Sequence, residues 1–421
     1  MIGVGLTAVA FTFPGVRAGA VEAAGVAAVF VPSLSEDADL SRALTAGGRS
    51  LSPAPAATPY AWKDLARAQP GNDSLFAAPA SICWRGDKLI VADGGTERLV
   101  RFTEAGRPNG VIGGPGVAPG RFSGLAVVRC GGGTTPILAA DEEQWRLSEF
   151  DASGRLVASF RAPPTPQIRL YVGDFAVAPD GRWFDSWLGS TRSNGPYLDD
   201  AAWKPEGLVR RWSASGRQEG AFGTVVPYDN PVARRVLNHT ALAFSRDTLW
   251  VLTQGDATIH AFAGADATPG TIIRLPVYYR GREPRALLRG GEADPSGWRS
   301  NQLVWQPNVE GLAVVEDSLF AVLRFGDWRL ALRGKPGNRW VDYYARTAVE
   351  LVDRGGRVVA SLDVPGQGIA VASDGGSRLA VLSEGQDGTR HVWLSSGSLL
   401  DARLRRTDAC SASCSASTFW H

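Results

Sequence analysis

Short apolar stretches flanked by polar turn residues recur along most of the chain. Residues 89–102 align without a gap to residues 137–150, so that Asp93 matches Asp141. A mostly apolar four-residue motif occurs six times, at residues 81–84, 124–127, 174–177, 241–244, 311–314 and 368–371. Short apolar runs that alternate with Gly-containing turns predict β-strands. The pattern therefore predicts six repeated units built from strands.

Each predicted unit holds four short antiparallel strands and spans roughly 40–60 residues, which is typical of the blades of a β-propeller. One blade leaves both faces of its sheet apolar, so blades must stack around an axis and share a continuous core. The sequence therefore predicts an all-β, six-bladed β-propeller over residues 75–398, with almost no long helix.

The sixth predicted unit lacks an outer strand of its own. We expect it from Val29–Pro32, within an N-terminal arm or linker of residues 21–74, or from Leu399–Leu404. The second candidate belongs to a C-terminal strand and disordered tail of residues 399–421. Closure of the ring by either segment would remove its exposed strand edges.

Composition narrows the class of protein. The 421 residues are 44% hydrophobic and 20% charged, which describes a globular chain rather than a disordered one. The net charge of +2 argues against nucleic acid as a partner. Cys83 and Cys130 lie in apolar runs, so we expect inert thiols in the core. Cys410 and Cys414 stand in the Ser/Ala-rich tail, where their spacing is only a weak metal signal, and we expect a local disulfide or an unstructured tail.

The N-terminus carries a pattern that is typical of export. Residues 2–13 are mostly apolar, and Ala18-Gly19-Ala20 follows them. Such a segment predicts a secretory signal in residues 1–20, although a charged start is missing. We therefore expect a periplasmic or secreted protein without a transmembrane span in the mature chain.

Two stretches resemble a known family. Residues 113–127, GGPGVAPGRFSGLAV, look like the segment between blades of NHL repeats, and residues 89–102 look like the second and third strands of that repeat. The resemblance implies an NHL-repeat or TolB-like six-bladed propeller. It covers residues 75–160 well and the later units by periodicity. The Asp/Arg pair of the first units is absent near Gln254, Arg324 and Glu384, so the fold carries over better than any function.

Propeller geometry brings the loops that enter the inner strands and the ends of the second strands to one face, around the channel mouth. The candidate ligand residues predicted there are Asp174, His239, Glu310 and Gln367. The matched pairs Asp93/Arg98 and Asp141/Arg146 are expected to be structural ion pairs between the second and third strands. Glu310, which precedes Gly311, resembles the metal-binding Glu of gluconolactonase-like propellers. With Asp174 and His239 it could hold one divalent cation such as Ca²⁺.

Two insertions, residues 276–308 and 326–345, interrupt the repeat around the fifth unit. Both combine Arg with Trp and Tyr, which is the composition of binding hot spots. We expect them to emerge on one face and to form one patch with Trp298, Trp305, Trp328 and Trp340 as contacts. The alternative is that both loops pack across one blade.

The sequence thus favours an extracytoplasmic binding or scaffold module for a protein or small-molecule ligand, without catalytic residues or a cofactor. The alternative is a propeller hydrolase or lyase, lactonase-like, with a divalent cation at the channel mouth. A third class, a cytoplasmic RNA-binding NHL-type domain, needs a strongly basic face, which the charge balance does not provide.

Overall fold

The strands are arranged as antiparallel four-stranded sheets in a computed structural model of the chain. It describes residues 62–67 and 76–395, apart from 104, 132–135, 145, 162–168, 179, 192–206, 228–237, 239, 254, 265–266, 277–278, 280–284, 287–302, 305–308, 336–337 and 386. Within these ranges, the side chains of residues 169–173, 187–191, 285–286, 303–304, 310 and 327–344 are also not described. The expected signal segment and the C-terminal tail lie outside the described residues.

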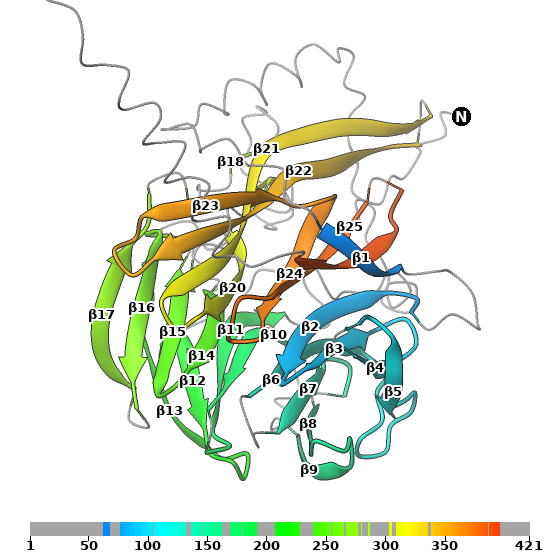
Figure 1. Cartoon of the computed structure of the whole chain (residues 1–421), viewed down its shortest axis with the longest axis vertical. Helices are drawn as coiled ribbons and strands as arrows, with labels where there is room; N and C mark the ends of the chain where they lie inside the picture. The colour runs from blue at the N-terminus through cyan, green and yellow to red at the C-terminus, as the bar shows by residue number, and fades with distance from the viewer. Residues whose placement is uncertain are drawn as a thin grey trace, which may run out of the picture.

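Each blade is a meander of four strands, with the innermost strand first along the chain for blades one to five (Figure 1). Blade one consists of β2 (Pro79–Arg85), β3 (Lys88–Asp93), β4 (Arg98–Phe102) and β5 (Pro108–Gly113), and blade two of β6 (Leu125–Cys130), β7 (Ile137–Asp141), β8 (Arg146–Phe150) and β9 (Leu156–Arg161). Blade three consists of β10 (Arg169–Val177), β11 (Trp183–Thr191), β12 (Val209–Trp212) and β13 (Gln218–Phe222). Blade four consists of β14 (Thr240–Ser245), β15 (Thr248–Thr253), β16 (Thr258–Ala263) and β17 (Thr268–Arg274).

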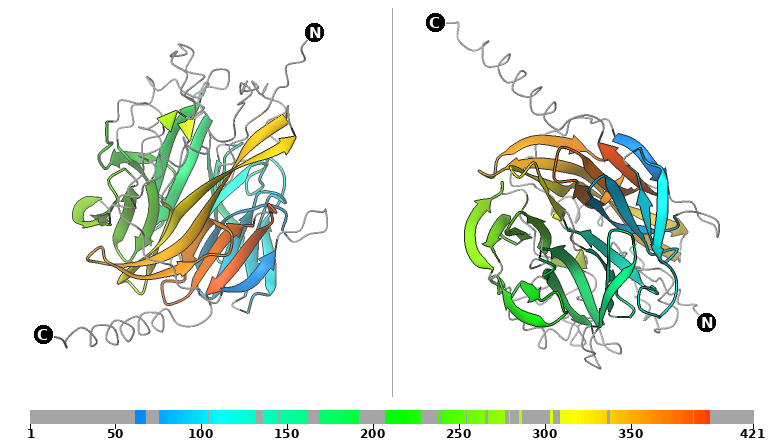
Figure 2. Two further views of the ribbon diagram at one scale, coloured as in Figure 1. Left: turned by 90° about the horizontal axis from the view of Figure 1, so that it is seen from above. Right: turned by 60° about the horizontal axis from the view of Figure 1, so that its bottom comes forward.

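Blade five consists of β20 (Val309–Val315), β21 (Leu319–Lys335), β22 (Asn338–Asp353) and β23 (Val358–Asp363). Blade six consists of β24 (Gln367–Ser373), β25 (Leu379–Glu384), β26 (Arg390–Ser395) and β1 (Trp62–Arg67), and a separate two-stranded sheet pairs β18 (Arg285–Ala286) with β19 (Leu303–Val304). Each inner strand contacts the inner strand of the next blade, and β24 contacts β2 (Figure 2). The all-β, six-bladed propeller predicted from the sequence is confirmed.

The ring is closed by a strand that the sequence did not single out. β1 pairs antiparallel with β26 and forms the outer edge of blade six, in place of Val29–Pro32 or Leu399–Leu404. Trp62 donates from its indole Nε1 to the carbonyl of Asp363 at 2.6 Å. Asp64 lies 3.0 Å from Nδ1 of His391. The last blade thus combines strands from both ends of the propeller.

Glycine-containing turns end the third strands, as the sequence predicted. In the turn 151–155, one carboxylate oxygen of Asp151 accepts hydrogen bonds from the backbone N–H groups of Ser153 and Arg155, at 2.9 and 3.0 Å. Gly154 has a φ of 89°, a left-handed conformation that costs glycine little. The turn 353–357 repeats the arrangement with Asp353 and Gly356, whose φ is 81°. The local sequence alone explains these hairpins.

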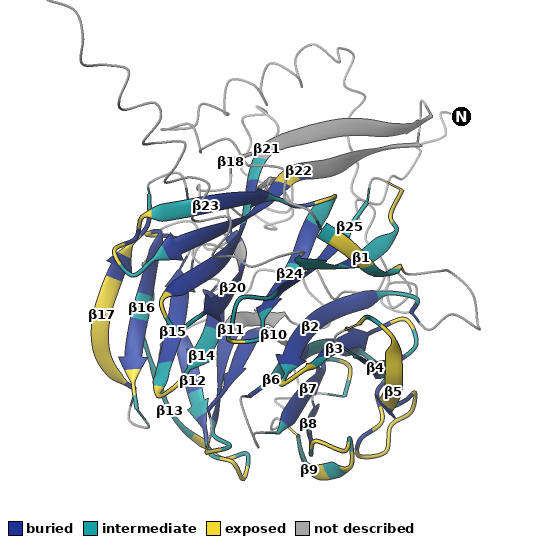
Figure 3. Ribbon diagram, in the orientation of Figure 1, coloured by how far each residue is buried: buried dark blue, intermediate teal, exposed yellow. Residues whose placement is uncertain are grey.

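The core is a set of apolar layers between neighbouring blades. Inner and middle strands are buried, whereas the outer strands β5 and β17 are largely exposed (Figure 3). One cluster joins Ile82 and Val91 of blade one to Ile369 and Leu382 of blade six. The seam where the ring closes is therefore packed by the same kind of apolar layer as the other seams.

The expectation that Cys83 and Cys130 are free core thiols is wrong. They form a disulfide that joins the inner strands of blades one and two. The two residues lie 47 positions apart in the sequence, so the local pattern showed two apolar strands and gave no sign of their contact. Among the described residues, no helix is long and apolar enough to cross a membrane.

Candidate functional site at the channel mouth

Asp93 and Asp141 hold the loops that enter the inner strands, but not through the expected ion pairs. The carboxylate of Asp93 accepts hydrogen bonds from the backbone N–H groups of Ala77 and Ala78, at 2.9 and 2.6 Å. It also accepts from the N–H of Gly95 and the hydroxyl of Thr96. Arg98, its cross-strand neighbour, donates instead to the carbonyl of Thr96.

Blade two repeats this arrangement. Asp141 accepts hydrogen bonds from the N–H of Ser123 at 2.7 Å and from the N–H of Gln144 at 2.8 Å. Arg146 donates to the carbonyl of Val117 at 2.8 Å. In the part of the chain that the structure describes, neither aspartate forms an ion pair with its cross-strand arginine. The predicted ion pairs are therefore wrong, because the partners are mainly backbone amides, together with the side chains of Thr96 and Gln144.

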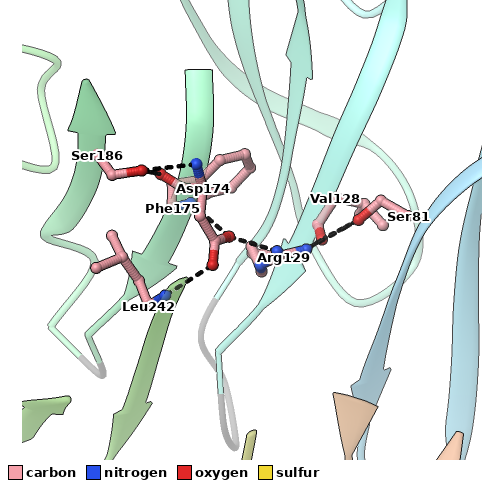
Figure 4. Close-up of polar contacts among 7 residues, drawn as sticks. All are labelled: Ser81, Val128, Arg129, Asp174, Phe175, Ser186 and Leu242. Atoms are coloured by element: carbon pink, nitrogen blue, oxygen red, sulfur yellow. Dashed lines mark hydrogen bonds and ion pairs between the residues drawn. The ribbon is translucent and has the colours of Figure 1, made fainter. Parts of the chain in front are cut away.

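Asp174, a predicted ligand residue, lies at the centre of a buried polar network (Figure 4). One carboxylate oxygen accepts from the guanidinium of Arg129 and from the N–H of Phe175 at 2.8 Å. The other accepts from the N–H of Leu242 at 2.7 Å. Arg129 also donates to the hydroxyl of Ser81 at 2.8 Å. The network joins the inner strands of blades one to four.

Carboxylates of this face accept hydrogen bonds from backbone N–H groups of the inner strands that have no strand partner on the axis side. The innermost strand of a blade has no neighbour on the axis side, so its inward N–H groups need another acceptor. Asp174 supplies one for Leu242, and Glu97 supplies one for Leu125 at 2.8 Å. In both cases an acid of one blade binds the inner strand of the next. These carboxylates therefore link neighbouring blades around the axis.

The surroundings of Asp174 do not fit a cation ligand. Burial raises the pKa of its carboxyl, and Arg129 together with the two backbone N–H groups opposes that rise. Both oxygens already accept hydrogen bonds, and a guanidinium stands where a metal ion would be repelled. Among the described residues, no group of three or more His, Cys, Asp or Glu side chains is arranged to hold a metal ion.

Of the other residues predicted at the channel mouth, the structure gives the backbone position of Glu310 and the position of Gln367. Glu310 lies in β20 beside the register pair Val309 and Arg324. Its side chain, and the whole of His239, lie outside the described residues, so their roles stay predictions. Gln367 begins β24 and is half-buried. Its side-chain oxygen accepts from the N–H of Ala345 at 3.4 Å.

Blade four carries a polar cluster that the sequence did not suggest. The hydroxyl of Thr258 lies 2.6 Å from Oδ1 of Asp256 and 2.7 Å from Nε2 of His260. Burial opposes ionisation of Asp256, but hydrogen bonds from His260, Thr253 and Thr258 outweigh it and lower its pKa to about 2. Because ionised Asp256 can only accept, Thr258 donates to it, and His260 must donate to Thr258. In this arrangement the ring of His260 is a hydrogen-bond donor to Thr258.

Glu142 is a further titratable group at this face. It follows Asp141 at the end of β7, is half-buried, and its backbone N–H donates to the carbonyl of Gly124 at 3.0 Å. Burial, with the neighbouring Asp141, raises the pKa of Glu142 to about 8. The side chain is therefore mainly a neutral acid at pH 7. The sequence contained little indication of this role for Glu142, because Glu142 and Glu143 look like the acidic residues of an ordinary solvent-exposed turn.

Both insertions of blade five are anchored at the mouth face. The first begins beyond β17, and its Tyr279 is fully buried and donates to Glu350. Arg324, at the base of the second, donates to the same carboxylate at 2.6 Å. Tyr279 therefore belongs to the core and not to the expected surface patch. Trp298 and Trp305 lie outside the described residues.

The second insertion is a continuation of two strands. Register pairs run without interruption from Arg329–Tyr344 to Lys335–Asn338, so β21 and β22 extend beyond the sheet as a two-stranded ribbon (Figure 1). We refer to Gly326–Lys335 and Asn338–Arg346 as the ribbon. Trp328 and Trp340 stand on its strands. Val309, the first residue of β20, pairs with Arg324, so the exit of the first insertion lies beside the ribbon's base.

The comparisons with known proteins show no family for this chain. No protein-family model matches the chain. No curated protein matches it significantly. A structure named "putative exported protein" from Bacteroides fragilis is 12% identical, with a TM-score of 0.49, over 82% of this chain and 96% of that one. A DUF4221 family member from Bacteroides vulgatus is 10% identical, with a TM-score of 0.47, over 80% and 98%.

A third similar structure is the calcium-binding protein regucalcin from Agrobacterium tumefaciens. It is 13% identical, with a TM-score of 0.46, over 82% of this chain and 96% of that one. At such identities the likeness concerns the propeller and not the chemistry of its site. The comparisons do not confirm the NHL or TolB-like family.

Proposed function

We propose that this protein is an extracytoplasmic six-bladed propeller that acts as a binding or scaffold module through its channel-mouth face. The observation that carries the proposal is the ribbon. Other strands of the ring have four to nine residues, whereas β21 and β22 have 17 and 16. The added length makes no pairs with β20 or β23, so it does not serve the sheet.

The proposed location outside the cytoplasm is supported by the Cys83–Cys130 disulfide. Disulfides persist in the periplasm and in secreted proteins, and they are rare in reducing compartments. The predicted signal segment in residues 1–20 points to the same location. A small ligand inside the channel is less well supported, because the network around Asp174 and Arg129 occupies the space between four inner strands.

We do not extend the proposal to a hydrolase or lyase. Glu142 could donate a proton at neutral pH, but a general acid needs a second group positioned across a substrate. The predicted cation site would also require Asp174 to give up Arg129, which would leave a buried guanidinium without its partner. Binding by the ribbon requires neither a second catalytic group nor the separation of Asp174 from Arg129.

Removal of the ribbon tests the proposal. Arg329 and Tyr344 are register partners, so an Asn-Gly turn can replace residues 330–343 and close a short hairpin that keeps the buried Ala345. We expect this variant to melt like the intact protein but to lose the partner that the intact protein captures from the native envelope fraction. The matched control is Ile272→Ser on the exposed strand β17, which should capture the partner normally. Equal capture by the shortened variant would refute the proposal.

A further inference from the structure

The ribbon has strand edges that no described strand covers. β20 pairs with β21 up to Arg324, and β23 pairs with β22 from Ala348 onward. A register shift between Gly326 and Arg329 marks the point where the ribbon leaves the sheet. Two-stranded hairpins are marginally stable in water without further packing. A ribbon of this length therefore favours a partner that adds to it.

The register divides the ribbon into two faces of different composition. Successive residues of a strand alternate between faces, and register partners share one. Arg329 therefore shares a face with its partner Tyr344, and Arg333 with Trp340. Lys335 also lies on this face, and so does Asp342, the register partner of Ala331. The other face takes Leu330, Leu332, Val341 and Tyr343, together with Arg339, the register partner of Gly334.

The charge of the ribbon is unlike that of the whole chain. Residues 326–346 hold five basic and two acidic residues, Asp327 and Asp342, a difference of +3. The complete chain of 421 residues has a net charge of +2. The ribbon therefore carries a net positive charge. An anionic partner would be complementary to it.

We propose that the edge of β21 within the ribbon, which no described strand covers, binds an extended acidic polypeptide segment in which acidic and apolar residues alternate. This inference rests on the proposed function and names the partner class. A strand added beside β21 gains backbone hydrogen bonds, as in other cases of β-strand addition. Its acidic residues would then be cross-strand neighbours of Arg329, Arg333 and Lys335, and its apolar residues would adjoin Leu330 and Leu332. Arg binds carboxylates in a bidentate manner, which suits this pairing.

A labelled 12-residue peptide of alternating Glu and Val is the probe. Fluorescence anisotropy with the full-length protein should show binding that weakens with added salt. Arg329→Glu/Arg333→Glu should weaken it by at least about tenfold, because hydrogen bonds to charged groups are among the stronger ones. The control Arg107→Glu, at an exposed turn of blade one, should leave binding unchanged.

Two further peptides separate strand addition from charge attraction. A peptide of the same composition with all Glu residues in one block should bind at least about tenfold more weakly, since it cannot place carboxylates at alternate positions. A peptide methylated at alternate backbone nitrogens, which lacks the required N–H groups, should not bind.

Three results would overturn the inference. They are no binding below about 1 mM, equal binding by Arg329→Glu/Arg333→Glu, and binding to phosphatidylglycerol vesicles without binding to the peptide. If the peptide fails while removal of the ribbon still abolishes capture from the envelope fraction, the proposed function stands and the partner class is wrong.

Discussion

Single residues in this propeller serve mainly to satisfy backbone groups at the strand ends and along the axis. Asp93 was assigned to an ion pair because Arg98 is its register partner. The backbone N–H groups of Ala77 and Ala78 donate to that carboxylate instead. Arg129 was overlooked, although an arginine inside the apolar inner strand of blade two is itself a sign of a buried partner.

Substitutions of Asp93 and Arg98 should have unequal effects. Asp93→Ala removes a buried acceptor of three backbone N–H groups; two of them, at Ala77 and Ala78, are partly buried, and each costs about 1–3 kcal/mol when left unsatisfied. We expect the free energy of unfolding in urea to fall by about 3 kcal/mol or more. Arg98→Ala should lower it by less than about 1 kcal/mol. Equal losses for the two variants would restore the ion-pair interpretation.

At the level of elements, the strands of the ring have ordinary lengths, except for β21 and β22, which extend beyond the sheet as the ribbon. β1, from the N-terminal arm, completes blade six and covers the edge of β26. Leu65 and Ala66 pack on the apolar cluster between blades six and one. The ribbon of blade five has the opposite character, since its edges stay uncovered by described strands. One element closes the fold, and the other extends it.

Deletion of β1 should weaken the ring. A protein that lacks residues 1–67 loses the outer strand of blade six, and we expect its thermal midpoint to fall by at least about 5 °C, as a loss of a few kcal/mol does in a large domain. The exposed edge of β26 should also promote association, visible by light scattering. A protein that lacks residues 1–61 keeps β1 and is the matched control. Identical melting of the two proteins would show that another segment closes the blade.

For the whole molecule, stability depends on seams between blades. Apolar layers fill these seams, Arg129 and Asp174 link four inner strands, and the Cys83–Cys130 disulfide joins blades one and two. A closed ring makes every blade depend on its two neighbours, because each sheet face is apolar. A covalent bond between inner strands therefore stabilises the ring and not merely one hairpin.

Loss of the disulfide should lower stability without changing the fold. Its sequence separation of 47 residues corresponds to about 4 kcal/mol of loop-closure entropy in the unfolded chain. We expect Cys83→Ala/Cys130→Ala to lower the free energy of unfolding by about 2–4 kcal/mol. Dithiothreitol should lower the free energy of unfolding of the wild-type protein by a similar amount and leave that of the double variant unchanged. If dithiothreitol also lowered the free energy of unfolding of the double variant, the Cys83–Cys130 bond would be excluded as the cause of the effect.

The sequence by itself determined the number of blades, most strands and the glycine turns. Alternation of apolar residues and turn residues such as Asp151 and Gly154 are local signals, and they act within a few residues of the chain. Tertiary structure alone decided that Trp62–Arg67 closes blade six, that Cys83 bonds to Cys130, and that Asp174 binds Arg129. These pairings join residues distant in the sequence, so their energies depend on distances that exist only once the blades have assembled. The local sequence pattern predicts that a residue is buried, but it does not predict which distant residue that side chain contacts.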